Sequence, residues 1–104
     1  MERGHRVIVD ILAKVYFKSD SIVFRKIGDE FILVPIRHDV AELDSIYTLN
    51  ETAARIWELI DGKRTLHEIK NTMIAEFDVT PAGAENDLIE HLQQLEGIRA
   101  VSAR

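Results

Sequence analysis

The sequence changes character at Asn50, because the residues before it favour strands and those after it favour helices. Residues 22–27 and 31–34 are rich in β-branched and aromatic side chains, and a short glycine-containing loop separates them. They predict a β-hairpin that ends at Pro35, since proline cannot donate to a strand ladder. Residues 45–49 predict a third short strand. A two-stranded ribbon is only marginally stable alone, so a third strand and a layer of helices are expected.

Three amphipathic helices are predicted after this point, each with a recognisable first residue. Asn50 is a good N-cap for a helix that runs to about Ile60. Thr65 and Glu68 have the spacing of a capping box at the start of the second helix. Thr80 caps the third, and the proline that follows it suits the first helical position. Apolar residues in each helix recur at the spacing of one buried stripe.

The order of elements is therefore three strands followed by three helices. Segregated strands and helices predict an α+β domain, here a winged-helix-like three-stranded antiparallel sheet followed by a three-helix bundle. Gly62 and Gly97 are expected to end the first and third helices. We expect this domain to span residues 18–104. Residues 1–17 form an N-terminal arm of uncertain structure, because their apolar spacing fits both a strand and a helix.

Composition excludes several classes of function. The chain has 104 residues, 46% of them hydrophobic, which suits one soluble domain. It has no cysteine, which excludes disulfides, thiolate metal sites and cysteine nucleophiles. The four histidines are not paired at helical spacing, and no nucleotide-binding, hydrolase or metalloprotease motif is present. We therefore expect no catalytic residue, no cofactor and no metal site, and a chain that is not an enzyme.

No targeting signal or membrane span is evident in the sequence. The apolar stretch at residues 7–12 is interrupted by Asp10 and is far too short to cross a bilayer. We therefore expect a cytoplasmic protein without a membrane partner.

Charge is distributed unevenly along the chain. The net charge is −5; residues 1–26 carry six basic and three acidic residues, whereas residues 27–104 carry seven and fifteen. The predicted third helix, residues 82–96, contains four carboxylates and neither lysine nor arginine. A winged helix usually reads DNA with this helix, and carboxylates would be repelled by phosphates. A DNA-binding transcriptional regulator therefore remains only as the alternative function, and we expect no nucleic-acid partner.

Peptide or protein recognition is the remaining class. An edge strand offers unpaired N–H and C=O groups to an incoming chain. Residues 45–49 carry no charge and could form such an edge, with side-chain pockets supplied by the neighbouring helix. The strand could equally be a core strand whose edge is covered, and its pattern alone leaves both interpretations open.

Residues 49–62 read LNETAARIWELIDG, and this run resembles the PqqD family pattern of LN, T-A, I-W, L and D-G at these spacings. Residues 27–30, 33–35 and 79–88 also look similar to that family. The resemblance covers about residues 18–98. The motif residues already have physical roles as a core side chain, a cap, an interface aromatic and a turn. The motif is therefore more informative about the scaffold than about the ligand.

The resemblance implies a peptide chaperone, or recognition element, for ribosomally made and post-translationally modified peptides. Such a module binds the leader of the precursor peptide by strand addition and presents it to a modifying enzyme, often a radical SAM enzyme. The pathway would be pyrroloquinoline quinone (PQQ) biosynthesis or a related peptide pathway. In this family the leader adds to the third strand and packs against the third helix.

Carried onto this sequence, the resemblance places the peptide between residues 45–49 and residues 82–96. The backbone of the strand would supply hydrogen bonds, and helix positions on either side of the core stripe would supply pockets. The candidate peptide-binding residues are Ser45, Ile46, Tyr47, Thr48, Leu49, Glu85, Asp87, Ile89, His91 and Gln94.

Charge predicts two further features of binding. The acidic helix favours a partner segment that carries lysine or arginine. The basic N-terminal arm could lie along the free strand edge when no peptide is bound, either in the same chain or swapped within a homodimer. It could equally be a disordered tail.

Overall fold

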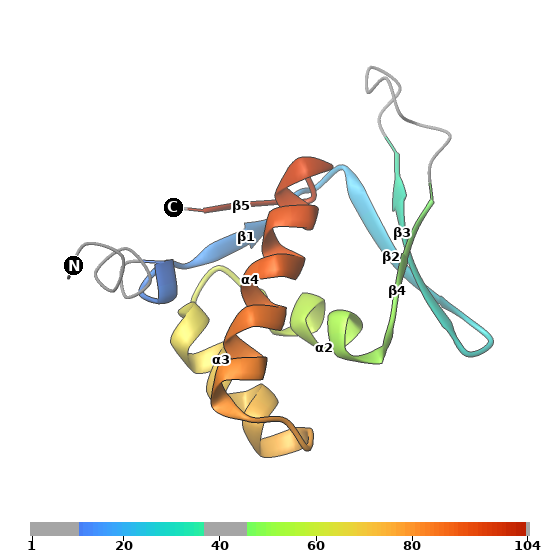
Figure 1. Cartoon of the computed structure of the whole chain (residues 1–104). Coiled ribbons are helices and arrows are strands. Elements are labelled where there is room, and N and C mark those ends of the chain that lie inside the picture. Colours follow the sequence, from blue (N-terminus) through green and yellow to red (C-terminus); the bar gives the residue numbers. More distant parts are fainter. Residues whose placement is uncertain (1–10, 37–45, 104) are drawn as a thin grey trace.

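The computed structural model describes residues 11–36 and 46–103 of the chain. Their fold is α+β, with helices and strands in the order expected from the sequence and one further pair of strands at the chain ends (Figure 1). The elements are β1 (Tyr16–Lys18), β2 (Ile22–Ile27), β3 (Glu30–Pro35), β4 (Tyr47–Leu49), α2 (Glu51–Leu59), α3 (Leu66–Glu76), α4 (Pro81–Gly97) and β5 (Val101–Ala103).

The predicted antiparallel sheet is confirmed, with the strand order β2-β3-β4. Phe24 pairs with Leu33 in the hairpin, and Leu33 pairs in turn with Tyr47 of β4. Gly28 adopts a φ of 61°, the left-handed conformation that a tight hairpin turn needs. The turn is shorter than the loop expected from the sequence, because β3 already begins at Glu30.

The three predicted helix starts are confirmed by their caps. The Asn50 side chain accepts a hydrogen bond of 2.8 Å from the backbone N–H of Ala53. Thr65 heads a complete capping box, in which Glu68 reaches back to the N–H of Thr65. Thr80 accepts a bond of 3.0 Å from the third backbone N–H beyond it. Each cap satisfies a donor that the first turn of a helix leaves unpaired.

The ends of the helices follow the sequence less closely. Gly62, expected to end the first helix, adopts a φ of 77°, but α2 already ends at Leu59 with an extended C-cap at Ile60, so the glycine shapes the turn two residues beyond the cap. Gly97 was expected to stop the third helix, and α4 does end there, but the left-handed residue is Arg99 with a φ of 61°. The left-handed backbone conformation therefore occurs two residues after Gly97, and the next residue, Ala100, is buried.

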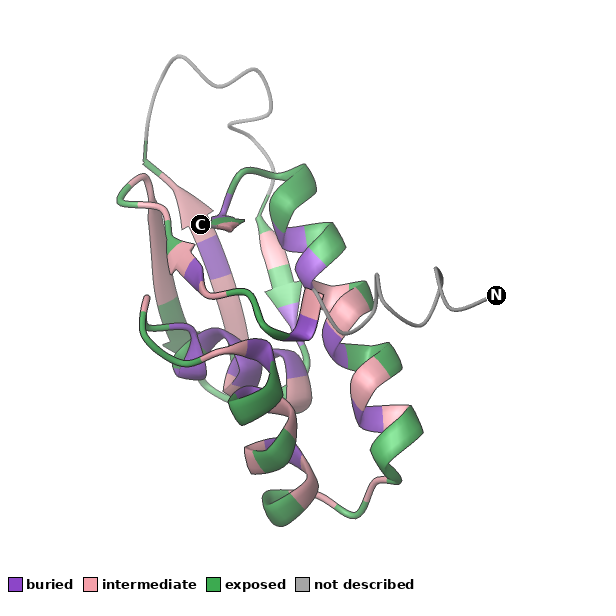
Figure 2. Cartoon of the chain, turned by 90° about the vertical axis from the view of Figure 1, so that its left-hand side faces the viewer, coloured by how far each residue is buried: buried purple, intermediate pink, exposed green. Residues whose placement is uncertain are grey.

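A single apolar core lies between the sheet and the helices, and buried residues line the inward faces of all three helices (Figure 2). Trp57 of α2 meets the sheet, where its ring stacks on Phe24 with the centroids 6.5 Å apart. The predicted stripe of α4, including Leu88 and Leu92, is buried on its inner side. Within the described ranges, no helix combines the length and the apolar character that a membrane span requires.

A second, two-stranded sheet joins segments that are far apart in the sequence, since β1 pairs antiparallel with β5. The sequence pattern of residues 1–17 fits both a strand and a helix. The described part of this segment contains both, because residues 11–12 are helical and β1 follows them. Leu12 and Tyr16 are buried in the core. The predicted placement of the N-terminal arm on the third strand concerns residues 1–10 as well, and these lie outside the described residues. That placement and the homodimer remain predictions.

Gly62 is the residue at which this second sheet constrains the fold most tightly. A Cβ at this position would lie 2.7 Å from Cε2 of Phe17 in β1, and the φ is in the left-handed region. We expect Gly62→Ala to lower the free energy of unfolding by about 1–3 kcal/mol, measured by urea denaturation. Gly97→Ala is the control, because its Cβ would meet nothing within 4 Å; it should raise stability by about 0.5–1 kcal/mol. Equal stability of Gly62→Ala and the wild type would contradict this account.

An ion pair between Arg55 and Glu76 ties α2 to α3, with two hydrogen bonds of 2.7 Å. These bonds lower the pKa of the Glu76 carboxyl below its ordinary value of 4.5. The ion pair therefore stabilises the folded state fully at pH values above 4.5, and this stabilisation is lost as the pH falls through the lowered pKa of Glu76. We expect Glu76→Gln to be less stable than the wild type at pH 7, and the difference to close in acid. Glu90→Gln, which removes a carboxylate without an ion pair among the described residues, should show no such pH dependence.

Candidate functional site

The outer edge of β4 is the first feature of the candidate site. Within residues 11–36 and 46–103, β4 pairs with β3 on one side and with no strand on the other. Along an antiparallel edge strand, every second residue directs both its N–H and its C=O away from the partner strand. The edge can therefore accept the backbone of an added strand.

The side chains of β4 divide between its two faces. Leu49 is only 4% exposed and belongs to the core, so only its backbone is available to a ligand. Tyr47 shares that face and is half-buried, whereas Thr48 between them is exposed. Ile46, just before the strand, is 60% exposed. Ser45 lies outside the described residues.

A hydrogen bond links β4 to α4. The Tyr47 hydroxyl donates to Oε1 of Gln94 at 2.5 Å, between two residues that are 47 positions apart in the sequence. Burial raises the pKa of Tyr47 above its ordinary value of 10.0, so the hydroxyl stays protonated and able to donate at neutral pH. The structure thus brings two of the predicted site residues into direct contact.

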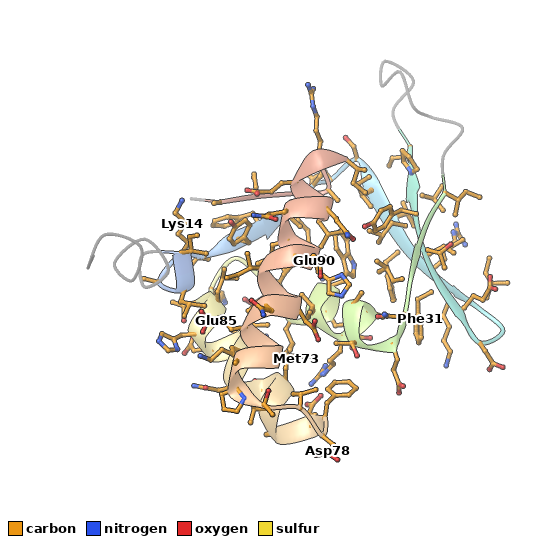
Figure 3. The ribbon with its side chains drawn as sticks, viewed as in Figure 1. Lys14, Phe31, Met73, Asp78, Glu85 and Glu90 are labelled. Carbon is orange, nitrogen blue, oxygen red and sulfur yellow. The ribbon has the colours of Figure 1, made fainter. Side chains whose placement is uncertain are left out.

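The other predicted residues of α4 fall on two sides of the helix. Asp87 and His91 lie seven and three positions before Gln94, a spacing that places all three on the side that meets Tyr47. Glu85 instead forms an ion pair of 3.2 Å with Lys70 of α3, and Figure 3 shows its side chain directed toward that helix. Ile89 lies one turn after Glu85 and therefore on that same side. The structure thus brings Asp87 and His91 toward β4, and it does not bring Glu85 and Ile89 there.

Among the described residues, the carboxylates of α4 have partners on one side of the helix only. Glu85 is paired with Lys70, and Glu96 accepts a hydrogen bond from Tyr16, whose pKa is raised by burial and by that carboxylate. Asp87 has no ion pair with any described residue, and α4 contains no lysine or arginine. The side that meets β4 is therefore the one that can still attract a cation. No group of three or more His, Asp or Glu that could hold a metal ion occurs in the described part.

A hollow lies at the end of this side, between the start of α2, the end of α3 and the start of α4. Its lining is mostly apolar, and Asp87 is the one charged residue in it. The residues around it are Thr52, Ile56, Met73, Phe77, Val79, Ala84 and Asp87. Sequence patterns do not place these seven residues together, because they come from three helices and from the turn that joins α3 to α4, and each helix pattern indicates only its own buried stripe.

Two solved structures share this fold. The chain is 26% identical to TbiB1, whose structure is in complex with the TbiA(β) leader peptide; the match covers 83% of this chain and 94% of that one, with a TM-score of 0.68. It is 17% identical to a lasso peptide synthetase B1 complexed with its leader peptide, with 84% and 96% coverage and a TM-score of 0.70. At that identity the second match shows the fold alone.

Sequence comparison agrees with the resemblance seen in residues 49–62. The chain is 41% identical over 54 residues to the PqqA binding protein of Acinetobacter baylyi (strain ATCC 33305 / BD413 / ADP1). That match spans 51% of this chain and about half, 52%, of the relative's length. The family described as coenzyme PQQ synthesis protein D matches residues 30–101, and the chain belongs to this family, PqqD.

Proposed function

We propose that this chain is an adaptor that binds the leader segment of a ribosomally made precursor peptide and presents it to a modifying enzyme. The observation that carries the proposal is the edge of β4 that pairs with no described strand, beside the side of α4 on which Asp87 has no ion pair with a described residue. An extended peptide would add to β4 as the next strand of the sheet.

The relatives support this ligand class. The structural match above 25% identity is to a protein in complex with a leader peptide, and the curated relative is named for binding the peptide PqqA. The leader of this chain's own precursor, and whether the pathway makes PQQ or another modified peptide, are not specified by these matches. A radical SAM enzyme is the modifying partner that we propose, with the bond-making chemistry on that partner and the complex in the cytoplasm.

Backbone pairing alone would give modest affinity. A peptide hydrogen bond contributes about 0.5–1.5 kcal/mol net, and the exposed stretch of residues 46–48 offers few of them. Side chains must add the rest, and we assign this to Asp87, His91 and Gln94 of α4. A peptide bound at Tyr47 would contact both the strand and the helix, because the Tyr47 hydroxyl already donates a hydrogen bond to Gln94 of α4.

Strand addition predicts which backbone amides respond to the peptide. In a titration of ¹⁵N-labelled chain with a synthetic candidate leader peptide, the amides of residues 46–49 and of α4 should shift together. The amides of β2, the other edge of the same sheet, are the internal control and should not move. A response confined to β2 or to β5, or none at all, would refute the assignment to β4.

Charge complementarity predicts that salt weakens binding. The affinity of the leader should fall as NaCl rises, because the exposed carboxylate of Asp87 is screened within about 10 Å at 0.1 M salt. A matched leader in which every lysine and arginine is replaced by glutamine should bind more weakly and with little salt dependence. Isothermal titration calorimetry at several salt concentrations measures both, and an affinity that is independent of salt would count against the acidic face.

A further inference from the structure

Among the described residues, one side-chain hydrogen bond joins β4 to α4. It runs from the Tyr47 hydroxyl to Oε1 of Gln94 and is exposed to solvent. Neither element depends on this bond for its position, because β4 is held by its ladder with β3 and α4 by its buried stripe of Leu88, Leu92 and Leu95. The bond can therefore open and close by side-chain rotation while the backbone of both elements stays in place.

The register of the sheet shows which backbone groups of β4 face an added strand. The N–H of Ile36 donates to the carbonyl of Ser21, so this pair is hydrogen-bonded, and every second pair along the hairpin follows it. By that alternation the backbone of Ile32 faces β2, and its neighbours in β3 bond to β4 through Tyr47 and the residue two positions on. Thr48 lies between these two and directs its N–H and C=O to the other side. A leader backbone would therefore bond to Thr48, directly beside Tyr47.

The Tyr47 side chain and the added strand need the same space. Tyr47 shares the inner face of β4 with Leu49, the face that the helices cover, and from there its hydroxyl reaches α4. A strand added at the outer edge would lie about 4.8 Å from β4, with alternate side chains on that inner face as well. Those side chains would meet the Tyr47–Gln94 pair, which already connects the inner face of β4 to the helix. The closed pair therefore obstructs strand addition.

We propose that the Tyr47–Gln94 hydrogen bond is a latch, closed in the free chain and broken by the leader as it adds to β4. The latch deepens the proposed function and rests on it, because it regulates access to the same strand edge. Breaking it frees the Gln94 amide, which can then bond to the leader. An exposed hydrogen bond between neutral groups is weak, so the closed latch lowers the apparent affinity by only about two- to tenfold.

Removal of the Tyr47 hydroxyl tests the latch kinetically. The probe is synthetic PqqA with a fluorescent label, because the curated relative is named for binding this peptide. In stopped-flow measurements, Tyr47→Phe should associate with PqqA about two- to tenfold faster than the wild type, since the ring stays and the latch is gone. The association rate is decisive, because a lost contact with the bound leader would appear mainly in dissociation.

Tyr16→Phe is the matched control for this variant. It removes the hydroxyl of the only other tyrosine in the sequence, which bonds to Glu96 instead, and it should leave the association rate unchanged. A rate for Tyr47→Phe that is unchanged or slower would overturn the latch. Equal acceleration by both variants would also overturn it, because the effect would then not depend on the contact with α4.

A cross-link tests whether strand and helix must separate. The chain has no cysteine, so a variant with Tyr47→Cys and Gln94→Cys offers only two thiols, which a bis-methanethiosulfonate reagent can join. The cross-linked chain should bind PqqA at least about tenfold more weakly than the same chain after reduction. Each single cysteine variant, capped with methyl methanethiosulfonate, is the control, and its change on reduction should be much smaller. Equal binding by the cross-linked and reduced chains would contradict the proposal.

The latch also has a direct spectroscopic signature. In the free chain, nuclear Overhauser effects should connect the ring Hε protons of Tyr47 with the Hγ protons of Gln94. Saturation with PqqA should remove these effects, while those between the stacked rings of Phe24 and Trp57 persist as the internal control. If the Tyr47–Gln94 effects persist once the amides of residues 46–49 have shifted, the leader adds without opening the pair, and the proposal is overturned.

The latch and the proposed function can fail separately. If PqqA shifts the amides of β4 while Tyr47→Phe associates no faster and the Tyr47–Gln94 contact persists, the latch is wrong and the adaptor function stands. If PqqA binds neither the wild type nor Tyr47→Phe, the adaptor function fails for this leader, and the latch that rests on it is overturned with it.

Discussion

The burial of α2 on two sides is the constraint on which the rest of this structure depends. Trp57 contacts the sheet through Phe24, while Ile56 and Leu59 belong to the same core as the other two helices. Because Asn50 is the only residue between β4 and α2, burying the helix also fixes where β4 can lie. The short strand is held against β3 at the end of the sheet, and within the described residues no strand pairs with its second side.

With β4 in this position, the two sides of α4 have different surroundings. Toward α3 and β1 its carboxylates are satisfied, since Glu85 meets Lys70 and Glu96 meets Tyr16. Toward β4 the contact is polar and exposed, through Tyr47 and Gln94, and no described residue forms an ion pair with Asp87. A helix that is needed for the core thus keeps one side free for the cationic, extended ligand that we propose. This division explains how an acidic winged-helix-like fold would serve as a peptide adaptor.

The sequence predicted the elements whose signals are local. Caps at Asn50, Thr65 and Thr80, and the apolar stripes behind them, placed the three helices correctly. The pairing of β1 with β5 was not predicted, because the two strands are separated by most of the chain and each is three residues long. For the site, helix spacing gave two candidate sides of α4, and only tertiary contacts such as that of Lys70 distinguish them. The hollow had no local signal, because it arises only when three helices pack.

The central claim is that a leader peptide becomes the next strand of the sheet at β4. Cross-strand Hα–Hα nuclear Overhauser effects between an unlabelled leader and the ¹³C,¹⁵N-labelled chain test it most directly, since they arise only between paired strands. The account predicts such effects between the leader and residues 46–49, with the β3–β4 pairing unchanged. Cross-strand effects to β2 in place of β4, or a leader bound in helical form, would contradict it.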